Sequence, residues 1–159
     1  MRWVIVVIIT CSTSCISPAR ASIWQEQMLN SVNEIRIERD LAPLALCRPL
    51  TSAAQKFAES LAKQNFLAHK GKDGSSPGDR IQKAGYKWKN SNKTSMIAEN
   101  IAGGQNSVPA VMKAWQNSSG HFKNIVEPRF THVGFGMATD LNSKFKKYWV
   151  QNFGFGANC

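Results

Sequence analysis

Apolar and polar residues alternate with a helical period near the start of the chain. The apolar set consists of Trp24, Met28, Val32 and Ile35. Residues three or four apart lie on one face of a helix, and charged residues occupy the positions between them. The pattern predicts an amphipathic helix that ends near Asp40, before Pro43.

A second apolar face follows Pro49, a residue well suited to the first turn of a helix. Its members are Leu50, Ala53, Ala54, Phe57, Ala58 and Leu61. The small alanine side chains predict that this helix packs closely against another element.

Two shorter helices are expected further along. One covers residues 79–84 and ends at Gly85. The other is capped by Ser107, runs through Trp115 and ends at Gly120.

The strands come late in the sequence. Residues 131–138 alternate with period two, residues 140–143 have the composition of a turn, and residues 148–153 form the expected return strand. Residues 96–102 are a candidate third strand. Early helices and a late hairpin predict an α+β fold in which helices pack on a small antiparallel sheet.

The first 21 residues have the features of a signal peptide. Arg2 supplies a positive charge, residues 4–9 form an apolar run, and Ala19-Arg20-Ala21 provides a cleavage site. The apolar run is too short to span a bilayer. The prediction is therefore a leader at 1–21 and a single domain at 22–159, with no transmembrane segment in the mature chain.

Export to the extracellular space or the periplasm follows from such a leader. An alternative is a lipoprotein anchored at Cys15 or Cys11, since the residues before each of these cysteines match a lipidation site in part. Cleavage after Ala21 leaves Cys47 and Cys159 as the mature cysteines. In an oxidising compartment they should form a disulfide, the alternative being two free thiols.

The formal charge of +10 becomes +8 once Arg2 and Arg20 are removed. A basic surface favours anionic partners such as lipid headgroups or acidic cell-wall polymers. The lysines are scattered, and no nucleic-acid-binding motif accompanies them, so a nucleic-acid partner is not expected.

Four short signatures carry a resemblance to a known family. They are Phe-Leu-Ala-His-Lys-Gly at 66–71, Ala-Glu-Asn-Ile-Ala-Gly-Gly at 98–104, Ser-Gly-His-Phe-Lys-Asn-Ile at 119–125, and Phe-Thr-His-Val-Gly-Phe-Gly at 130–136. Over about residues 27–154 the chain resembles the bacterial type of the CAP superfamily. This superfamily comprises cysteine-rich secretory proteins, antigen 5 and pathogenesis-related class 1 proteins. The resemblance implies an α-β-α sandwich.

The resemblance also implies a central cavity with two histidines and two acidic residues. His69, at the end of the second helix, matches the first histidine, and Glu99 matches the first acid. His121, after the helix stop at Gly120, matches the second histidine. The fourth member is open between Asp79 and Glu59, because the acid of the plant-type pattern is replaced by Ser118. Bacterial relatives often carry histidine where this chain has Phe57.

Several family members bind a divalent metal in this cavity, commonly zinc. His69, His121 and Glu99 supply nitrogen and oxygen donors that suit zinc. The favoured function is a non-enzymatic, monomeric binding module for a lipid, sterol, cell-wall or host partner. The alternative is a metal-assisted hydrolase or protease, in which bound zinc would activate a water molecule.

Overall fold

The computed structural model describes residues 22–87, 97–155 and 159. The predicted leader, with Cys11 and Cys15, lies outside the described residues. The helices and strands are α1 (Ile23–Ile37), β1 (Ala45–Leu46), α2 (Arg48–Lys63), α3 (Pro77–Lys83), β2 (Ile97–Gly103), α4 (Val108–Gln116), α5 (Ser119–Ile125), β3 (His132–Thr139) and β4 (Lys147–Gly154).

The four described strands form one sheet in the order β1-β3-β4-β2. β3 and β4 make the predicted hairpin, and β2 pairs antiparallel with β4, so that Glu99 lies opposite Asn152. The α+β prediction is confirmed. The sheet is nevertheless mixed, because β1 runs parallel to β3. A two-residue strand is too short to show a period, so the sequence pattern did not predict β1.

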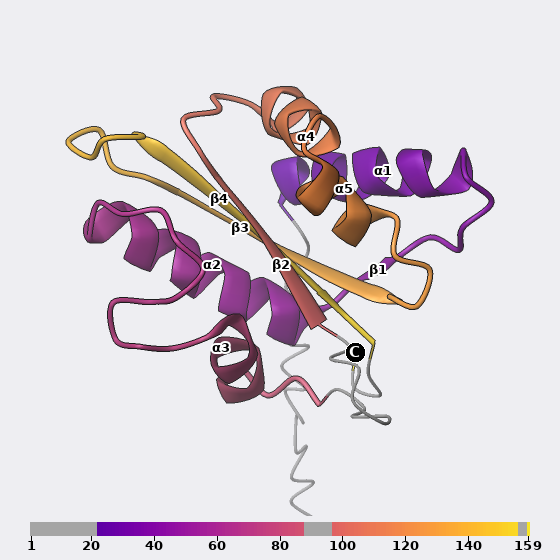
Figure 1. Cartoon of the computed structure of the whole chain (residues 1–159), viewed down its shortest axis with the longest axis horizontal. Helices are drawn as coiled ribbons and strands as arrows, with labels where there is room; N and C mark the ends of the chain where they lie inside the picture. Colours follow the sequence, from indigo (N-terminus) through magenta and orange to yellow (C-terminus); the bar gives the residue numbers. More distant parts are fainter. Residues whose placement is uncertain (1–21, 88–96, 156–158) are drawn as a thin grey trace, which may run out of the picture.

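The helices cover both faces of the sheet (Figure 1). α1, α4 and α5 lie on one side, and α2 and α3 on the other. On the first side Phe135 and Trp149 of the sheet pack with Met28 and Trp115 of the helices. None of the helices in the described ranges is both long and apolar enough to cross a membrane.

The predicted close approach of α2 occurs over β3. A Cβ atom placed on Gly134 would lie 2.2 Å from the backbone nitrogen of Thr51. One placed on Gly136 would lie 2.2 Å from the carbonyl group of Ala54. Because these contacts involve helix backbone, the two glycines set the distance between α2 and the sheet.

The first helix ends at Ile37, three residues before the predicted end near Asp40. Asp40 has a positive φ of 56°, and the backbone N–H of Leu41 donates to the carbonyl of Arg36 at 3.0 Å. A left-handed residue with a hydrogen bond back to the last turn is a common way to end a helix, and aspartate tolerates it.

The segment predicted as the fourth helix contains two helices. α4 is capped by Ser107 as expected but ends at Gln116, and Ser118 is the N-cap of α5. Gly120 therefore lies inside α5 rather than ending a helix. Buried Arg36 joins this region to α1, because its guanidinium donates to the carbonyls of Ile125 and Glu127, each at 2.9 Å.

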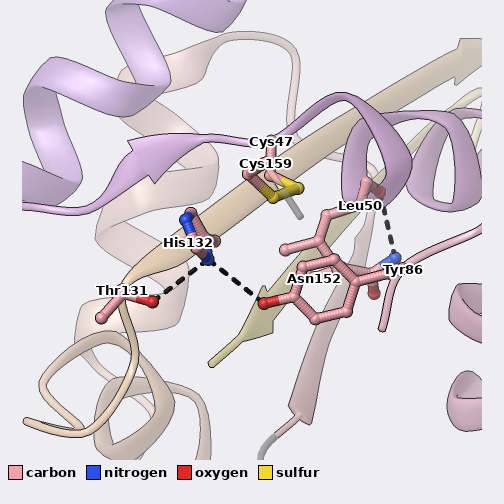
Figure 2. The surroundings of a disulfide bond; sticks show 7 residues. All are labelled: Cys47, Leu50, Tyr86, Thr131, His132, Asn152 and Cys159. Carbon is pink, nitrogen blue, oxygen red and sulfur yellow. Dashed lines mark hydrogen bonds between the residues drawn. A yellow bond between two sulfur atoms is a disulfide. The ribbon is translucent and has the colours of Figure 1, made fainter. Parts of the chain in front are cut away.

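The predicted disulfide joins Cys47, directly before α2, to Cys159 (Figure 2). His132 lies next to it, and its Nδ1 is 3.2 Å from the hydroxyl of Tyr86 and 3.1 Å from that of Thr131. Burial raises the pKa of Tyr86 to about 12 and lowers that of His132. The disulfide ties the start of α2 to the chain beyond β4, and His132 lies beside this link.

Candidate functional site

Glu99 is the central residue of the site. It lies on the edge strand β2 with its side chain facing α2 and α3, and that side chain is 1% exposed. Its Oε1 is 3.0 Å from Nδ1 of His69. Nη2 of Arg80 donates to its Oε2 at 2.9 Å and to its Oε1 at 3.1 Å. The carboxylate is thus buried but paired, as a buried charge requires.

Arg80 holds several segments together. Besides Glu99, its Nη2 donates to the carbonyl of His69 at 3.0 Å, and its Nη1 donates to the carbonyl of Ser75 at 2.9 Å. The guanidinium carbon is 3.4 Å from the centroid of the Phe57 ring, which is within the range of a cation–π interaction. Phe57, at the position where bacterial relatives often have histidine, therefore provides an apolar surface for the Arg80 guanidinium.

The prediction that His69 lies at the end of the second helix is wrong. α2 ends at Lys63, and Asn65 has a φ of 50°, which turns the chain out of the helix. His69 follows in the connecting segment, and its side chain is 52% exposed. It reaches Glu99 because its carbonyl and its imidazole are both held by the Arg80–Glu99 pair.

His121 is the third residue of α5 rather than a residue that follows a helix stop. Asn100 fixes its backbone, since Nδ2 of Asn100 donates to the carbonyl of His121 at 3.1 Å and to Oε1 of Gln151 at 3.0 Å. Nδ2 of Asn124 donates in turn to Oδ1 of Asn100 at 2.8 Å. Burial lowers the pKa of His121, and a positive charge on His69 lowers it further.

Glu99 and Asn100, which are adjacent in the second signature, contact residues on opposite faces of the sheet. Successive residues of a strand point to opposite faces of the sheet, so Glu99 faces α2 and α3 while Asn100 faces α5. Glu99 positions His69, and Asn100 positions the backbone of His121. His69 and Glu99 are thus in direct contact, and the backbone of His121 is held from the same strand by Asn100.

The two candidates for the fourth position have other partners. Asp79 accepts hydrogen bonds from the backbone N–H and the hydroxyl of Ser76, at 2.8 and 2.6 Å, and so caps α3. These bonds lower the pKa of Asp79. Glu59 is exposed on α2 and accepts from Nε2 of Gln55 at 2.9 Å. Both carboxylates are therefore engaged by neighbours on their own helices.

The fit of a metal ion can be tested on these side chains. Within residues 22–87, 97–155 and 159, no three His, Cys, Asp or Glu side chains are grouped so as to hold a metal ion. Glu99 is already neutralised by Arg80, which disfavours its use as a direct ligand. The two imidazoles, by contrast, have suitable donor atoms. The described residues therefore do not form a ready-made site with three ligands for a metal ion.

Arg80 is the functional residue that sequence reasoning missed. The Ser-Ser-Pro-Gly-Asp-Arg stretch suggested Asp79, because the family resemblance implies a second acid. The capping pattern of Ser76 and Asp79 could have identified Arg80. It indicates that Asp79 is used in the helix cap, which leaves the neighbouring arginine as the charged residue available to the site. Glu99, the partner of Arg80, is 19 residues away in sequence, and no local signature relates the two.

Helices layered on both faces of a small mixed sheet, with a His-Glu-Arg cluster at the sheet edge, define the class of protein. Residues 29–153 match the model of the CAP family, described as the cysteine-rich secretory protein family. The chain belongs to this family.

Curated relatives support the same assignment. The chain is 30% identical to the Bacillus subtilis protein YkwD over 142 residues, which cover 89% of this chain and 51% of YkwD. It is also 30% identical to the B. subtilis membrane protein YlbC over 129 residues, covering 81% of this chain and 34% of YlbC. The chain thus spans about half, or less, of the length of these relatives.

Solved structures share the fold. An extracellular protein containing an SCP domain from Bacillus anthracis matches with a TM-score of 0.69 and 26% identity, covering 82% of this chain and 40% of that one. An outer surface protein from Borrelia burgdorferi has a TM-score of 0.69 at 20% identity, covering 83% of this chain and 92% of that one.

Proposed function

We propose that the protein is an exported CAP-domain binding module, and that His69 and His121 hold a divalent cation such as zinc at its ligand site. The expected partners are lipids or anionic cell-surface polymers. The observation that carries the proposal is the pairing of Glu99, whose two carboxylate oxygens accept hydrogen bonds from Arg80.

The pairing of Glu99 argues for binding rather than for hydrolysis. A general base must be within reach of the water or substrate whose proton it accepts. The Glu99 side chain is 1% exposed, and both of its oxygens already have partners in Arg80 and His69. Glu99 is therefore suited to orienting His69 and not to activating a nucleophile.

The orientation of His69 supports cation binding. An ionised carboxylate can only accept a hydrogen bond, so Nδ1 of His69 carries the proton and Nε2 of the neutral ring keeps its lone pair. Histidines that bind metals usually donate their other N–H to a carboxylate or carbonyl, which fixes the ring and makes it a better ligand. The His69–Glu99 pair has this arrangement.

The proposed location and partners have their own support. The B. anthracis structure is described as an extracellular protein and the B. burgdorferi protein as an outer surface protein. This chain carries the features of a leader, and its charge is +10 with the leader and +8 without it. A net positive charge favours association with anionic surfaces.

Two measurements on the exported protein test the proposal. Lipid extraction with mass spectrometry, together with saturation binding to anionic vesicles and to isolated cell walls, should detect a bound or bindable partner. Broad peptide and ester profiling with added zinc should give equal background rates for the wild type and for His69→Ala/His121→Ala. Failure to bind any of these partners would contradict the binding module. A zinc-dependent rate that the double variant loses would favour the hydrolase instead.

A further inference from the structure

One end of the molecule combines exposed lysines with exposed apolar side chains. It is formed by the turn between β3 and β4 and by the segment at the end of α2, which lie side by side (Figure 1). Oδ1 of Asn65 joins the two, because it accepts from the backbone N–H of Lys144 at 2.7 Å and from the hydroxyl of Tyr148 at 3.4 Å. This surface, called the hairpin end below, consists of Lys63, Phe66, Leu67, Lys72, Leu141, Lys144, Phe145 and Lys146.

Four lysines that are scattered in the sequence meet at the hairpin end. Lys63 is the last residue of α2, and Nζ of Lys72 donates to the carbonyl of the next residue at 2.8 Å. Lys144 is held beside them through its backbone N–H, and Lys146 follows in the same turn. All four are exposed, and the ion pairs of residues 22–87, 97–155 and 159 do not involve any of them.

The lysines outnumber the acids of the same segments. The turn contributes Asp140 and the last two turns of α2 contribute Glu59, both taken as ionised. Lys147 follows the turn as a further cation. Lys70 and Asp73, which flank Lys72, cancel each other. Five lysines against two acids leave a net charge of +3 at this end of the molecule.

Apolar side chains lie among these lysines. Leu141, in the β3–β4 turn, is 74% exposed, and Leu67 is 36% exposed. Phe66 and Phe145 are partly buried and pack against one apolar cluster of α2 and β4 residues. Each of the two rings has a lysine Nζ 5.3 Å from its centroid, within the range of a cation–π interaction. The hairpin end is therefore both basic and apolar.

We propose that the hairpin end docks the protein on the surface of an anionic lipid bilayer. Lysines near such a surface are attracted by its acidic headgroups. Apolar side chains beside them gain by entering the boundary between headgroups and acyl chains. An acidic cell-wall polymer offers no apolar phase to Leu141, so the exposed leucine favours the bilayer. This inference rests on the proposed function, because it names the surface through which the exported module meets one of its partners.

The test measures cosedimentation of the mature chain with lipid vesicles. We expect saturable binding to phosphatidylcholine vesicles that contain about one-third phosphatidylglycerol, and at least about tenfold weaker binding to phosphatidylcholine alone. Binding should weaken as the ionic strength rises from about 0.05 to about 0.5 M, because salt screens the attraction between exposed charges. Isolated cell walls form a parallel arm of the experiment.

The charge of the surface is tested with a pair of matched variants. Lys63→Gln/Lys144→Gln should weaken binding to the anionic vesicles about tenfold or more, since each lysine near an anionic surface contributes to the affinity. Lys113→Gln/Lys123→Gln removes the same charge from α4 and α5 and should change it less than about twofold. All four lysines are exposed, so both variants should fold.

The apolar part is tested in the same way. Leu141→Ser should weaken vesicle binding about fivefold or more, because the side chain no longer leaves water for the bilayer. Ile37→Ser is the control, since Ile37 is 61% exposed at the end of α1 and is not part of the hairpin end. Leu141→Ser should leave binding to cell walls unchanged.

The outcomes separate this inference from the proposed function. Absence of binding to anionic vesicles, or equal weakening by a variant and its control, would overturn docking through the hairpin end. If the protein then still bound cell walls or carried an extractable lipid, the binding module would stand without this surface. If it bound none of these partners, both proposals would fail.

Discussion

Arg80 contacts both carboxylate oxygens of Glu99 from one guanidinium nitrogen, at 2.9 and 3.1 Å. The carboxylate is almost fully buried, and the arginine side chain is 13% exposed. This pair, rather than either histidine, determines the arrangement of the site. Arg80 also holds the carbonyl of His69, so the histidine, the carboxylate and α3 form one hydrogen-bonded unit.

Arg80→Met should destabilise the fold strongly, because it leaves the buried Glu99 carboxylate without its guanidinium partner. Breaking a buried ion pair from one side typically costs about 3–5 kcal/mol. Urea denaturation measures the free energy of unfolding. The matched control is Arg129→Met, which breaks the more exposed pair with Glu127 and should cost less than about 1 kcal/mol.

The double variant Arg80→Met/Glu99→Gln separates pairing from packing. Removal of both charges should recover a large part of the loss, since the buried carboxylate is then absent. If the double variant were as unstable as the sum of the two single variants, the pair would not be energetically coupled.

Gly136→Ala should also destabilise the protein. The added Cβ would lie 2.2 Å from backbone atoms of α2, which cannot move without displacing the helix. Overpacking of this kind costs about 1–3 kcal/mol. Gly120→Ala is the control, because it lies in a helix with no atom within 4 Å of its added Cβ, and it should be neutral or stabilising by up to about 1 kcal/mol. Equal effects in denaturant titrations would contradict the close packing of α2.

The disulfide gives a third prediction. It joins residues 112 positions apart, and a loop of about 100 residues is worth about 4.7 kcal/mol in the chain-entropy model, with measured values for native disulfides of about 2–5 kcal/mol. Cys47→Ala/Cys159→Ala should therefore lower the urea midpoint. Peptide mapping without reductant should recover the Cys47–Cys159 link from exported protein. Recovery of two free thiols would contradict it.

The sequence predicted most of the fold because amphipathic helices and the hairpin have local periods. Elements without a local period were not predicted correctly. β1 has two residues, and Gly120 looked like a helix stop although the break between α4 and α5 lies at Asn117 and Ser118.

The site residues were found through the family resemblance and not through spacing. Glu99 lies on β2, His121 on α5 and His69 in the segment between α2 and α3, so no local pattern relates them. The role of Arg80 depends on a partner that only the fold brings near, and Asp79 was chosen as an acid although its oxygens serve the cap of α3. The residue types predicted which donor and acceptor groups the site contains, whereas the pairing of Arg80 with Glu99 could be seen only in the tertiary structure.

Stability should depend on pH through His121 and His132. Burial lowers the pKa of both imidazoles in the folded state. The unfolded chain therefore takes up protons first, as the pH falls below about 6.5, and the free energy of unfolding decreases toward about pH 5. In chelated buffer, His121→Gln/His132→Gln should show a flatter dependence over this range. If the free energy of unfolding of this variant changed with pH as steeply as that of the wild type, other titrating groups would be responsible for the pH dependence.

The most direct test of the account is the effect of zinc on thermal unfolding. At about 100 times its dissociation constant, a ligand that binds only the folded state adds about 2.7 kcal/mol of stability. We predict that zinc raises the melting temperature of the wild type at about pH 7.5 and has little effect at about pH 5, where protons compete for the imidazoles. His132→Gln should keep the increase, and His69→Gln/His121→Gln should lose it. A melting temperature that zinc does not change, or that rises equally in the double variant, would contradict a cation site formed by His69 and His121.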